Sequence, residues 1–103
     1  MNLEELKCKL ESTGLPVAYR EWPEGESPGL PFIAYLCKDT NNLYADGEVY
    51  FTSDNVLVEL YTETKSPEKE NLVQTALKGY HWKKSETYIS TERCYMTTYE
   101  IEV

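Results

Sequence analysis

The stretch "VLVELYTETKSPEKENLVQTAL", residues 56–77, contains both kinds of regular structure from which the fold is built. Its first half is rich in β-branched and aromatic residues and predicts a buried strand. Ser66 is a typical N-cap, and Pro67 suits the first helical turn because the N–H that it lacks would have no partner there. We therefore expect a helix to begin at Ser66. Its buried stripe is predicted to consist of Leu72, Val73, Ala76 and Leu77.

The same stretch carries a serine, carboxylates and lysines that could be mistaken for an active site. Ser66 has no histidine beside it in the sequence, and the G-x-S-x-G turn that exposes a nucleophilic serine is absent. Glu68 and Glu70 lie near the expected start of the helix, where acidic side chains are stabilised by the helix dipole. The pattern thus predicts structural roles for these residues, with Ser66 as a helix cap.

A second amphipathic helix is expected over residues 2–13. Three leucines follow one another at helical spacing, with charged residues between them: Leu3, Leu6 and Leu10. Asn2 is the expected N-cap, and Gly14 is expected to end the helix in a left-handed conformation.

The residues between the two helices are predicted to form strands. "PVAYREW" (16–22) predicts a short strand, and "FIAYLCK" (32–38) is apolar nearly throughout, as in a central strand or one covered on both faces. Asp46-Gly47 is a strong signal for a two-residue hairpin. Residues 53–55, "SDN", are expected to form a bend or bulge before the next strand.

The last quarter of the chain predicts two more strands joined near residues 90–92. "YHWKKSETYI" (80–89) alternates weakly, and "CYMTTYEIEV" (94–103) alternates clearly. One face of the latter should hold Tyr95, Thr97, Tyr99, Ile101 and Val103. The order α-β-β-β-β-α-β-β predicts an α+β fold, in which two amphipathic helices pack on a mostly antiparallel sheet. We expect residues 1–103 to form a single domain, since the length suits one core.

Composition and charge exclude several classes of protein. The net charge is −8, from 18 acidic and 10 basic residues, which argues against a duplex-binding protein and against sequence-specific nucleic-acid binding. No apolar run approaches the roughly 20 residues of a membrane-spanning helix. The start, "MNLEELKCKL", has acids and lysines between its leucines, unlike a signal peptide, so a cytoplasmic protein is expected.

Candidate catalytic or metal-binding residues each have a simpler interpretation. Cys8, Cys37 and Cys94 are far apart and form no C-x-x-C pair, so we expect reduced thiols and no zinc site. A cysteine in a strand could be a nucleophile, but a buried thiol is the better interpretation. His81 could be a general base but lacks an evident partner, and a surface histidine is the simpler interpretation.

Other acidic residues do not form a recognisable site. A loose scatter surrounds the predicted hairpin without the oxygen spacing of a calcium loop: Asp39, Asp46, Glu48 and Asp54. We therefore expect no metal, no cofactor and no enzymatic activity.

The aromatic content favours protein–protein contact. Nine tyrosines and two tryptophans are many for 103 residues, and tyrosine gives a large contact area at low entropic cost. Loops commonly carry binding residues, and the loop "PEGESPGLP" (23–31) and the predicted hairpin have turn-rich sequences. The candidate interaction residues are Trp22, Glu24, Glu26, Asp46 and Gly47.

Five stretches carry a resemblance to a known family: "TGLPVAYREW", "GLPFIAYL", "NNLYADGEVY", "VELYTETKSPEKENLVQTAL" and "YEIEV". Together they resemble small proteins from the head-to-tail region of long-tailed phages and Gram-positive prophages. The resemblance implies a tail completion or tail terminator protein that caps the tail tube in a homo-oligomeric ring. It further implies other tail and head-completion proteins as partners, and a location in the host bacterial cytoplasm during assembly and then in the virion. It implies no catalytic residue.

The negative charge agrees with that resemblance and with one alternative. A ring through which DNA passes should not bind phosphate, and acidic residues repel it. A small acidic inhibitor of the DNA-mimic type would be acidic as well, but it should array its carboxylates on one face at phosphate-like spacing. Here lysines are interspersed with the acids along the chain. A small enzyme is a third alternative, and it lacks any motif.

Overall fold

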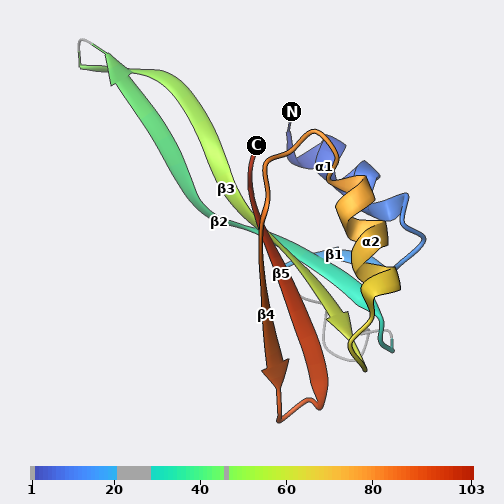
Figure 1. Ribbon diagram of the computed structural model, residues 1–103. Coiled ribbons are helices and arrows are strands. Elements are labelled where there is room, and N and C mark those ends of the chain that lie inside the picture. Colours follow the sequence, from blue (N-terminus) through green and yellow to red (C-terminus); the bar gives the residue numbers. More distant parts are fainter. Residues whose placement is uncertain (1, 21–28, 46) are drawn as a thin grey trace.

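The computed structural model describes residues 2–20, 29–45 and 47–103, which form a five-stranded mixed sheet with two helices on one face (Figure 1). The elements are α1 (Leu3–Glu11), β1 (Val17–Tyr19), β2 (Phe32–Ala45), β3 (Glu48–Thr62), α2 (Pro67–Ala76), β4 (Lys83–Ile89) and β5 (Cys94–Glu102). The predicted α+β class is confirmed. Both helices also begin at their predicted N-caps, Asn2 and Ser66.

The strand order in the sheet is β1-β2-β3-β5-β4. β1 runs parallel to β2, and the other three pairs are antiparallel, so the sheet is mostly antiparallel as predicted. The element order is α-β-β-β-α-β-β, with one strand fewer before α2 than the sequence suggested. The difference arises because the β2–β3 ladder continues through two register shifts, between Cys37 and Asp39 and between Leu43 and Tyr44, instead of breaking into shorter strands.

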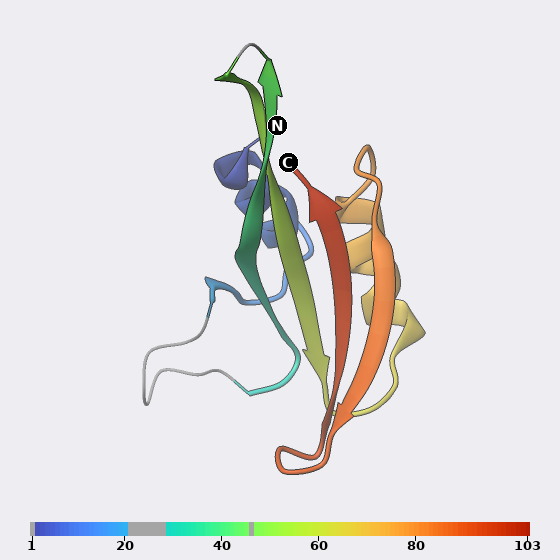
Figure 2. The ribbon, with the colours of Figure 1, turned by 90° about the vertical axis from the view of Figure 1, so that its left-hand side faces the viewer.

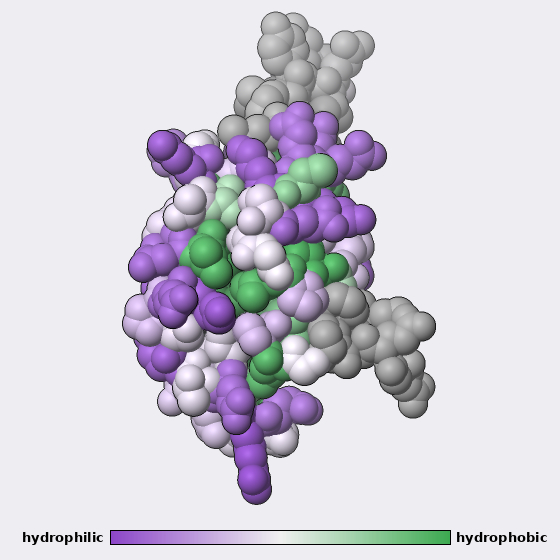
Figure 3. Space-filling view, turned by 90° about the vertical axis from the view of Figure 1, so that its right-hand side faces the viewer, coloured by the Kyte–Doolittle hydropathy of each residue, from purple (hydrophilic) through white to green (hydrophobic). Residues whose placement is uncertain are grey.

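The core lies between the helices and the face of the sheet that they cover. Leu6 and Leu10 of α1 and Val73 of α2 are completely buried there. The strands add further buried side chains to the same cluster, namely Ile33, Tyr35, Val56, Val58, Leu60, Tyr99 and Ile101. Figure 3 views the helix side and shows apolar side chains gathered near its centre with hydrophilic side chains around them.

The prediction that Leu72 belongs to the buried stripe of α2 was wrong. Leu72 is 38% exposed, whereas Glu70 is only 4% exposed. Successive helical residues are turned by about 100°, so a face centred on Val73 and Leu77 includes position 70 and turns position 72 toward solvent. The buried face of α2 thus includes the charged residue Glu70 and does not include Leu72.

The opposite face of the sheet is not covered by a helix, as Figure 2 shows with the strands in front and both helices behind. Its half-buried apolar residues on the central strands are Phe32, Leu36, Leu57, Tyr61 and Met96. The rings of Phe32 and Tyr61 stack with their centroids 4.9 Å apart. We call this surface the open face.

The β2–β3 hairpin extends well beyond the rest of the sheet (Figure 1). The backbone of Asp54 still exchanges two 2.9 Å hydrogen bonds with Val103, at the end of β5. Beyond that point, residues 41–45 and 48–53 pair only with one another in the described part of the chain. These residues are called the arm below. The arm makes the molecule elongated, with extents of 50 × 28 × 23 Å.

Candidate functional site

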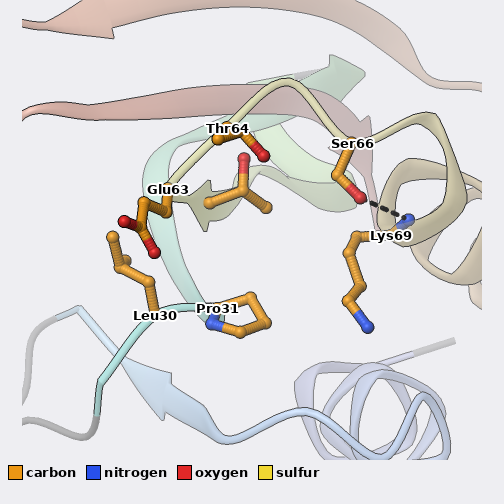
Figure 4. Close-up of a pocket in the computed structure, with 7 residues that line it drawn as sticks. Leu30, Pro31, Glu63, Thr64, Ser66 and Lys69 are labelled. Carbon is orange, nitrogen blue, oxygen red and sulfur yellow. Dashed lines mark hydrogen bonds between the residues drawn. The ribbon is translucent and has the colours of Figure 1, made fainter.

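A shallow pocket of about 150 Å³ lies where the residues before β2 meet the connection from β3 to α2 (Figure 4). It is lined by Leu30, Pro31, Thr62, Glu63, Thr64, Ser66 and Lys69. The Ser66 hydroxyl accepts a 3.3 Å hydrogen bond from the backbone N–H of Lys69, while the amine of Lys69 points away from that hydroxyl. The pocket therefore holds a helix cap and does not present a serine beside a base.

Replacing Ser66 with alanine should lower the free energy of unfolding by about 1 kcal/mol, because the N–H of Lys69 loses its partner. Ser66→Asp keeps an acceptor oxygen at the cap and should leave stability close to the wild-type value. Urea unfolding monitored by circular dichroism would measure both changes. A Ser66→Ala chain as stable as the wild type would show that the cap contributes nothing.

The most concentrated charge in the described structure is an ion-pair cluster around Glu70. Its buried carboxylate contacts Lys65 Nζ at 2.9 Å and, still more closely, Lys84 Nζ. Lys65 also contacts Glu86 at 2.6 Å. Burial alone would raise the pKa of Glu70, but the hydrogen bonds from Lys84 and Lys65 outweigh burial and hold that pKa below its ordinary value.

Neighbouring hydrogen bonds show that the cluster connects α2 to the sheet. The Tyr99 hydroxyl of β5 donates to Gln74 Oε1 at 3.1 Å, and the same oxygen accepts from Lys84 Nζ at 3.3 Å. A general acid needs a proton to give near neutral pH, whereas Glu70 is held in its ionised form by two ammonium groups. The cluster is therefore structural.

The cysteines and the histidine do not meet in a catalytic arrangement. Cys94 is buried in β5, and burial, followed by the charge of Glu92, raises the pKa of its thiol, which disfavours the nucleophilic thiolate. Cys37 is half-buried and its thiol donates to the Asp39 carbonyl at 3.5 Å. His81 was expected in a strand but lies exposed in the connection before β4. α2 ends at Ala76, Gly79 follows with a positive φ of 98°, and strand pairing of β4 begins only at Lys83.

A network of side-chain hydrogen bonds fixes the root of the arm. Asn55 Nδ2 donates to Asp39 Oδ1 at 2.5 Å, and Asn41 Nδ2 donates to Asn55 Oδ1 at 3.0 Å and to Glu102 Oε2 at 3.1 Å. On the same hairpin, Thr40 Oγ1 donates to an Asp54 carboxylate oxygen at 2.9 Å. These hydrogen bonds connect β2, β3 and β5 where the arm leaves the sheet, so they fix the direction of the arm relative to the sheet.

The predicted interaction residues are divided between described and undescribed parts of the chain. Gly47 lies exposed between β2 and β3, with a positive φ of 80° that suits the predicted hairpin turn. Trp22, Glu24, Glu26 and Asp46 lie outside the described residues. The sequence predicted the turn at Gly47 but did not predict how far the two strands of the arm extend before it.

Across residues 2–20, 29–45 and 47–103, no three histidine, cysteine or acidic side chains are grouped so that they could hold a metal ion. Within the same residues, neither helix has the length and apolar character needed to cross a bilayer. No protein-family model matches the chain, and a search of curated proteins finds no similar sequence. Among the residues that the structure describes, no helix covers the arm or the open face.

Proposed function

We propose that the protein is a structural subunit of phage morphogenesis, of the tail completion or tail terminator kind. It acts by assembling with copies of itself and with other tail and head-completion proteins, and it turns over no substrate. Assembly takes place in the host bacterial cytoplasm, and the protein remains in the virion. The observation that supports this proposal best is the arm.

A two-stranded ribbon on its own is marginally stable in water. Five residues on one strand of the arm extend it by about 17 Å, and within the described residues the arm has no further strand to pair with. An element of this kind is best explained by a partner surface that completes it. The hydrogen-bonded root supports the same proposal, because a contact element has to be held in one direction to meet a partner without a large entropic loss.

The open face offers a second contact surface. Its half-buried apolar residues lie on the three central strands, and two of them form a stacked aromatic pair. Contact surfaces in assemblies combine such apolar areas with a polar rim. A subunit with one projecting element and one apolar sheet face can contact neighbours on two sides.

The test is deletion of the gene from its inducible parent prophage, followed by electron microscopy of the lysate. We expect DNA-filled heads separated from tails, or tails of uncontrolled length. A plasmid copy of the wild-type gene should restore normal particles. A copy in which Asn-Gly replaces residues 42–52 should fail to restore them, although its thermal unfolding should stay close to that of the wild type, because the core and the hydrogen bonds from Asn41 to Asn55 and Glu102 are kept.

Normal infectious particles in normal number after deletion would contradict the proposal and favour the acidic-inhibitor alternative. Restoration by the arm-shortened copy would show that the chain acts in assembly without its arm.

A further inference from the structure

The sheet ends at β4, whose outer edge has no strand beside it in the described part of the chain (Figure 2). About half of the backbone N–H and C=O groups of such an edge strand point away from its neighbour and are left for water or for another strand. Every residue of β4 is exposed except the half-buried Ile89. The opposite edge of the sheet is β1, which has only three residues. With seven residues, β4 is the edge to which a further strand can be added.

The charge of β4 also differs from that of the whole chain. Residues 83–89 contain two lysines and one glutamate, whereas the complete chain has a net charge of −8. Two copies therefore repel one another in most orientations, and they do so least where the surfaces that meet are not acidic. A second copy that presents its own β4 to this edge meets that condition.

We infer that β4 pairs with β4 of a second copy, antiparallel and about a two-fold axis perpendicular to the sheet, so that two five-stranded sheets become one. This axis places the helices of both copies on the same side of the joined sheet. It also restricts the register, because directly opposite residues of antiparallel strands have their side chains on the same face. The axis therefore passes beside one residue of β4, which lies opposite its own copy. The inference goes beyond the proposed phage role and does not depend on it.

The charged residues of β4 select one register. An axis at Lys83 or Lys84 would oppose two lysines, and an axis at Glu86 would oppose two glutamates, which is destabilising. An axis at Thr87 would bring no opposite charges together. Only an axis at Ser85 places Lys84 of each copy opposite Glu86 of the other. Lysines usually protect an edge strand against pairing, and here they disfavour the other registers while allowing this one.

Both members of this ion pair have hydrogen-bonding capacity left for it. A lysine amine has three N–H donors, and that of Lys84 contacts Glu70 and, at 3.3 Å, Gln74 Oε1. Glu86 binds Lys65 through Oε1, and its Oε2 has no partner among the described residues. The third donor of Lys84 and the second oxygen of Glu86 can therefore meet across the two-fold axis. The ion-pair cluster around Glu70 would then continue from one copy into the other.

The same register brings exposed aromatic side chains together. Continued by one residue beyond β4, it places Trp82 opposite Tyr88 of the second copy, on the face that carries Lys84 and Glu86. Trp82 is 38% exposed and Tyr88 is 52% exposed. Trp82 also lines an open hollow of about 540 Å³, whose other walls come from α2 and the residues that follow it. Aromatic side chains that fill a concave surface often anchor protein contacts, so Tyr88 of the second copy has a surface on which to pack.

The contact is isologous, because both copies use the same strand. Once it forms, it covers the free edge of both, so association through β4 stops at a dimer. A contact of one edge strand on each side is smaller than the roughly 1,600 Å² of a standard interface. We therefore expect a dissociation constant on the order of 100 μM. The arm and the open face are left for other partners.

The first test places like charges on the two-fold axis. In Ser85→Glu two carboxylates lie directly opposite one another, and the dimer should form at least ~10-fold more weakly than that of the wild type. The control is Ser90→Glu, which makes the same change at an exposed residue of the β4–β5 turn and should dimerise like the wild type. Sedimentation equilibrium up to millimolar protein measures the association, and thermal unfolding checks that each variant is folded.

The second test reports the register. All chains carry Cys8→Ser, which removes the exposed thiol. Directly opposite residues of antiparallel strands have Cα atoms about 4.5–5.5 Å apart, which a disulfide can span. Ser85→Cys should therefore form a disulfide-linked dimer with oxidised glutathione. Ser90→Cys lies five residues from the axis, about 17 Å along the strand, and should remain monomeric on a non-reducing gel.

Three results would each overturn the inference: a wild-type chain that stays monomeric at millimolar concentration, a Ser85→Glu chain that dimerises like the wild type, or a Ser90→Cys chain that is cross-linked as fast as Ser85→Cys. All of these measurements use purified protein. Failure of the β4 contact can therefore be told apart from failure of the phage role, which the gene deletion tests.

Discussion

Replacing Leu6 with aspartate is expected to leave the protein unfolded at room temperature. Leu6 is completely buried between α1 and the sheet, in the same cluster as Leu10 and Val73. A carboxylate there would have no charged partner, and burying it costs several kcal/mol in addition to the lost apolar contact. The whole stability of a small domain is only about 5–15 kcal/mol. Circular dichroism should therefore show the loss of cooperative thermal unfolding.

Two further substitutions make this result interpretable. Lys7→Asp places the same side chain at the next, exposed position and should change stability by no more than about 0.5 kcal/mol. Leu6→Ala removes apolar contact without adding charge and should cost about 2–5 kcal/mol. A Leu6→Asp chain that melts like the wild type would mean that α1 is not docked on the sheet.

The second large effect is expected from removing both lysines that neutralise Glu70. In the variant Lys65→Met/Lys84→Met the buried carboxylate loses the charges that keep it ionised. We expect the melting temperature at pH 7 to fall by roughly 10 °C. This decrease is small for the loss of a buried ion pair, because both lysines are partly exposed to solvent. By contrast, Glu70→Met removes the buried charge itself and should be close to neutral.

The pH dependence of stability should also change sign. In the wild type the pKa of Glu70 is lowered, so its contribution is present above the ordinary carboxyl pKa and is lost as the pH falls below that value. Without the two ammonium groups, burial would raise the pKa of Glu70 instead. Protonation would then favour the folded state, and the variant should gain stability relative to the wild type as the pH is lowered from 7 toward 5.

Urea unfolding at several pH values would measure this difference, with Lys7→Met/Lys78→Met as a control that removes two exposed lysines. An equal loss of stability at every pH in the Glu70-cluster variant would mean that Glu70 stays ionised without its partners.

Local signals in the sequence predicted the helices well. The caps at Asn2 and Ser66 are predicted from short sequence patterns. The side-chain oxygen of Asn2 accepts the expected hydrogen bond from the N–H of Glu5, and the hydroxyl of Ser66 accepts one from the N–H of Lys69. The alternation of β5 is likewise confirmed, with Thr97 and Tyr99 buried on the helix side. Such features depend on residues a few positions apart, which is the range over which sequence patterns carry structural information.

Features that depend on distant parts of the chain were not predictable in this way. The buried Glu70 has Lys65 and Lys84 as ion-pair partners, and it is the pairing of β4 with β5 that brings Lys84 beside it, a neighbour that no local pattern in α2 indicates. The arm was missed for a related reason. The polar residues 39–42 look like the end of a strand, yet cross-strand pairing with β3 carries them on as part of β2.

The strand order β1-β2-β3-β5-β4 has a consequence for how the chain reaches its native state. The β2–β3 and β4–β5 pairs are hairpins whose contacts are close in sequence, so they can form early and independently. Uniting them requires β3 to meet β5, which pairs Thr62 with Tyr95 and Asn55 with Glu102, more than 30 residues apart in each case. Closing that long connection loses chain entropy before the core contacts of Val58 and Tyr99 compensate for it. We therefore expect the folding rate to be set by the meeting of two preformed hairpins, and changes in the length of the arm, which belongs to only one of them, to leave that rate unchanged.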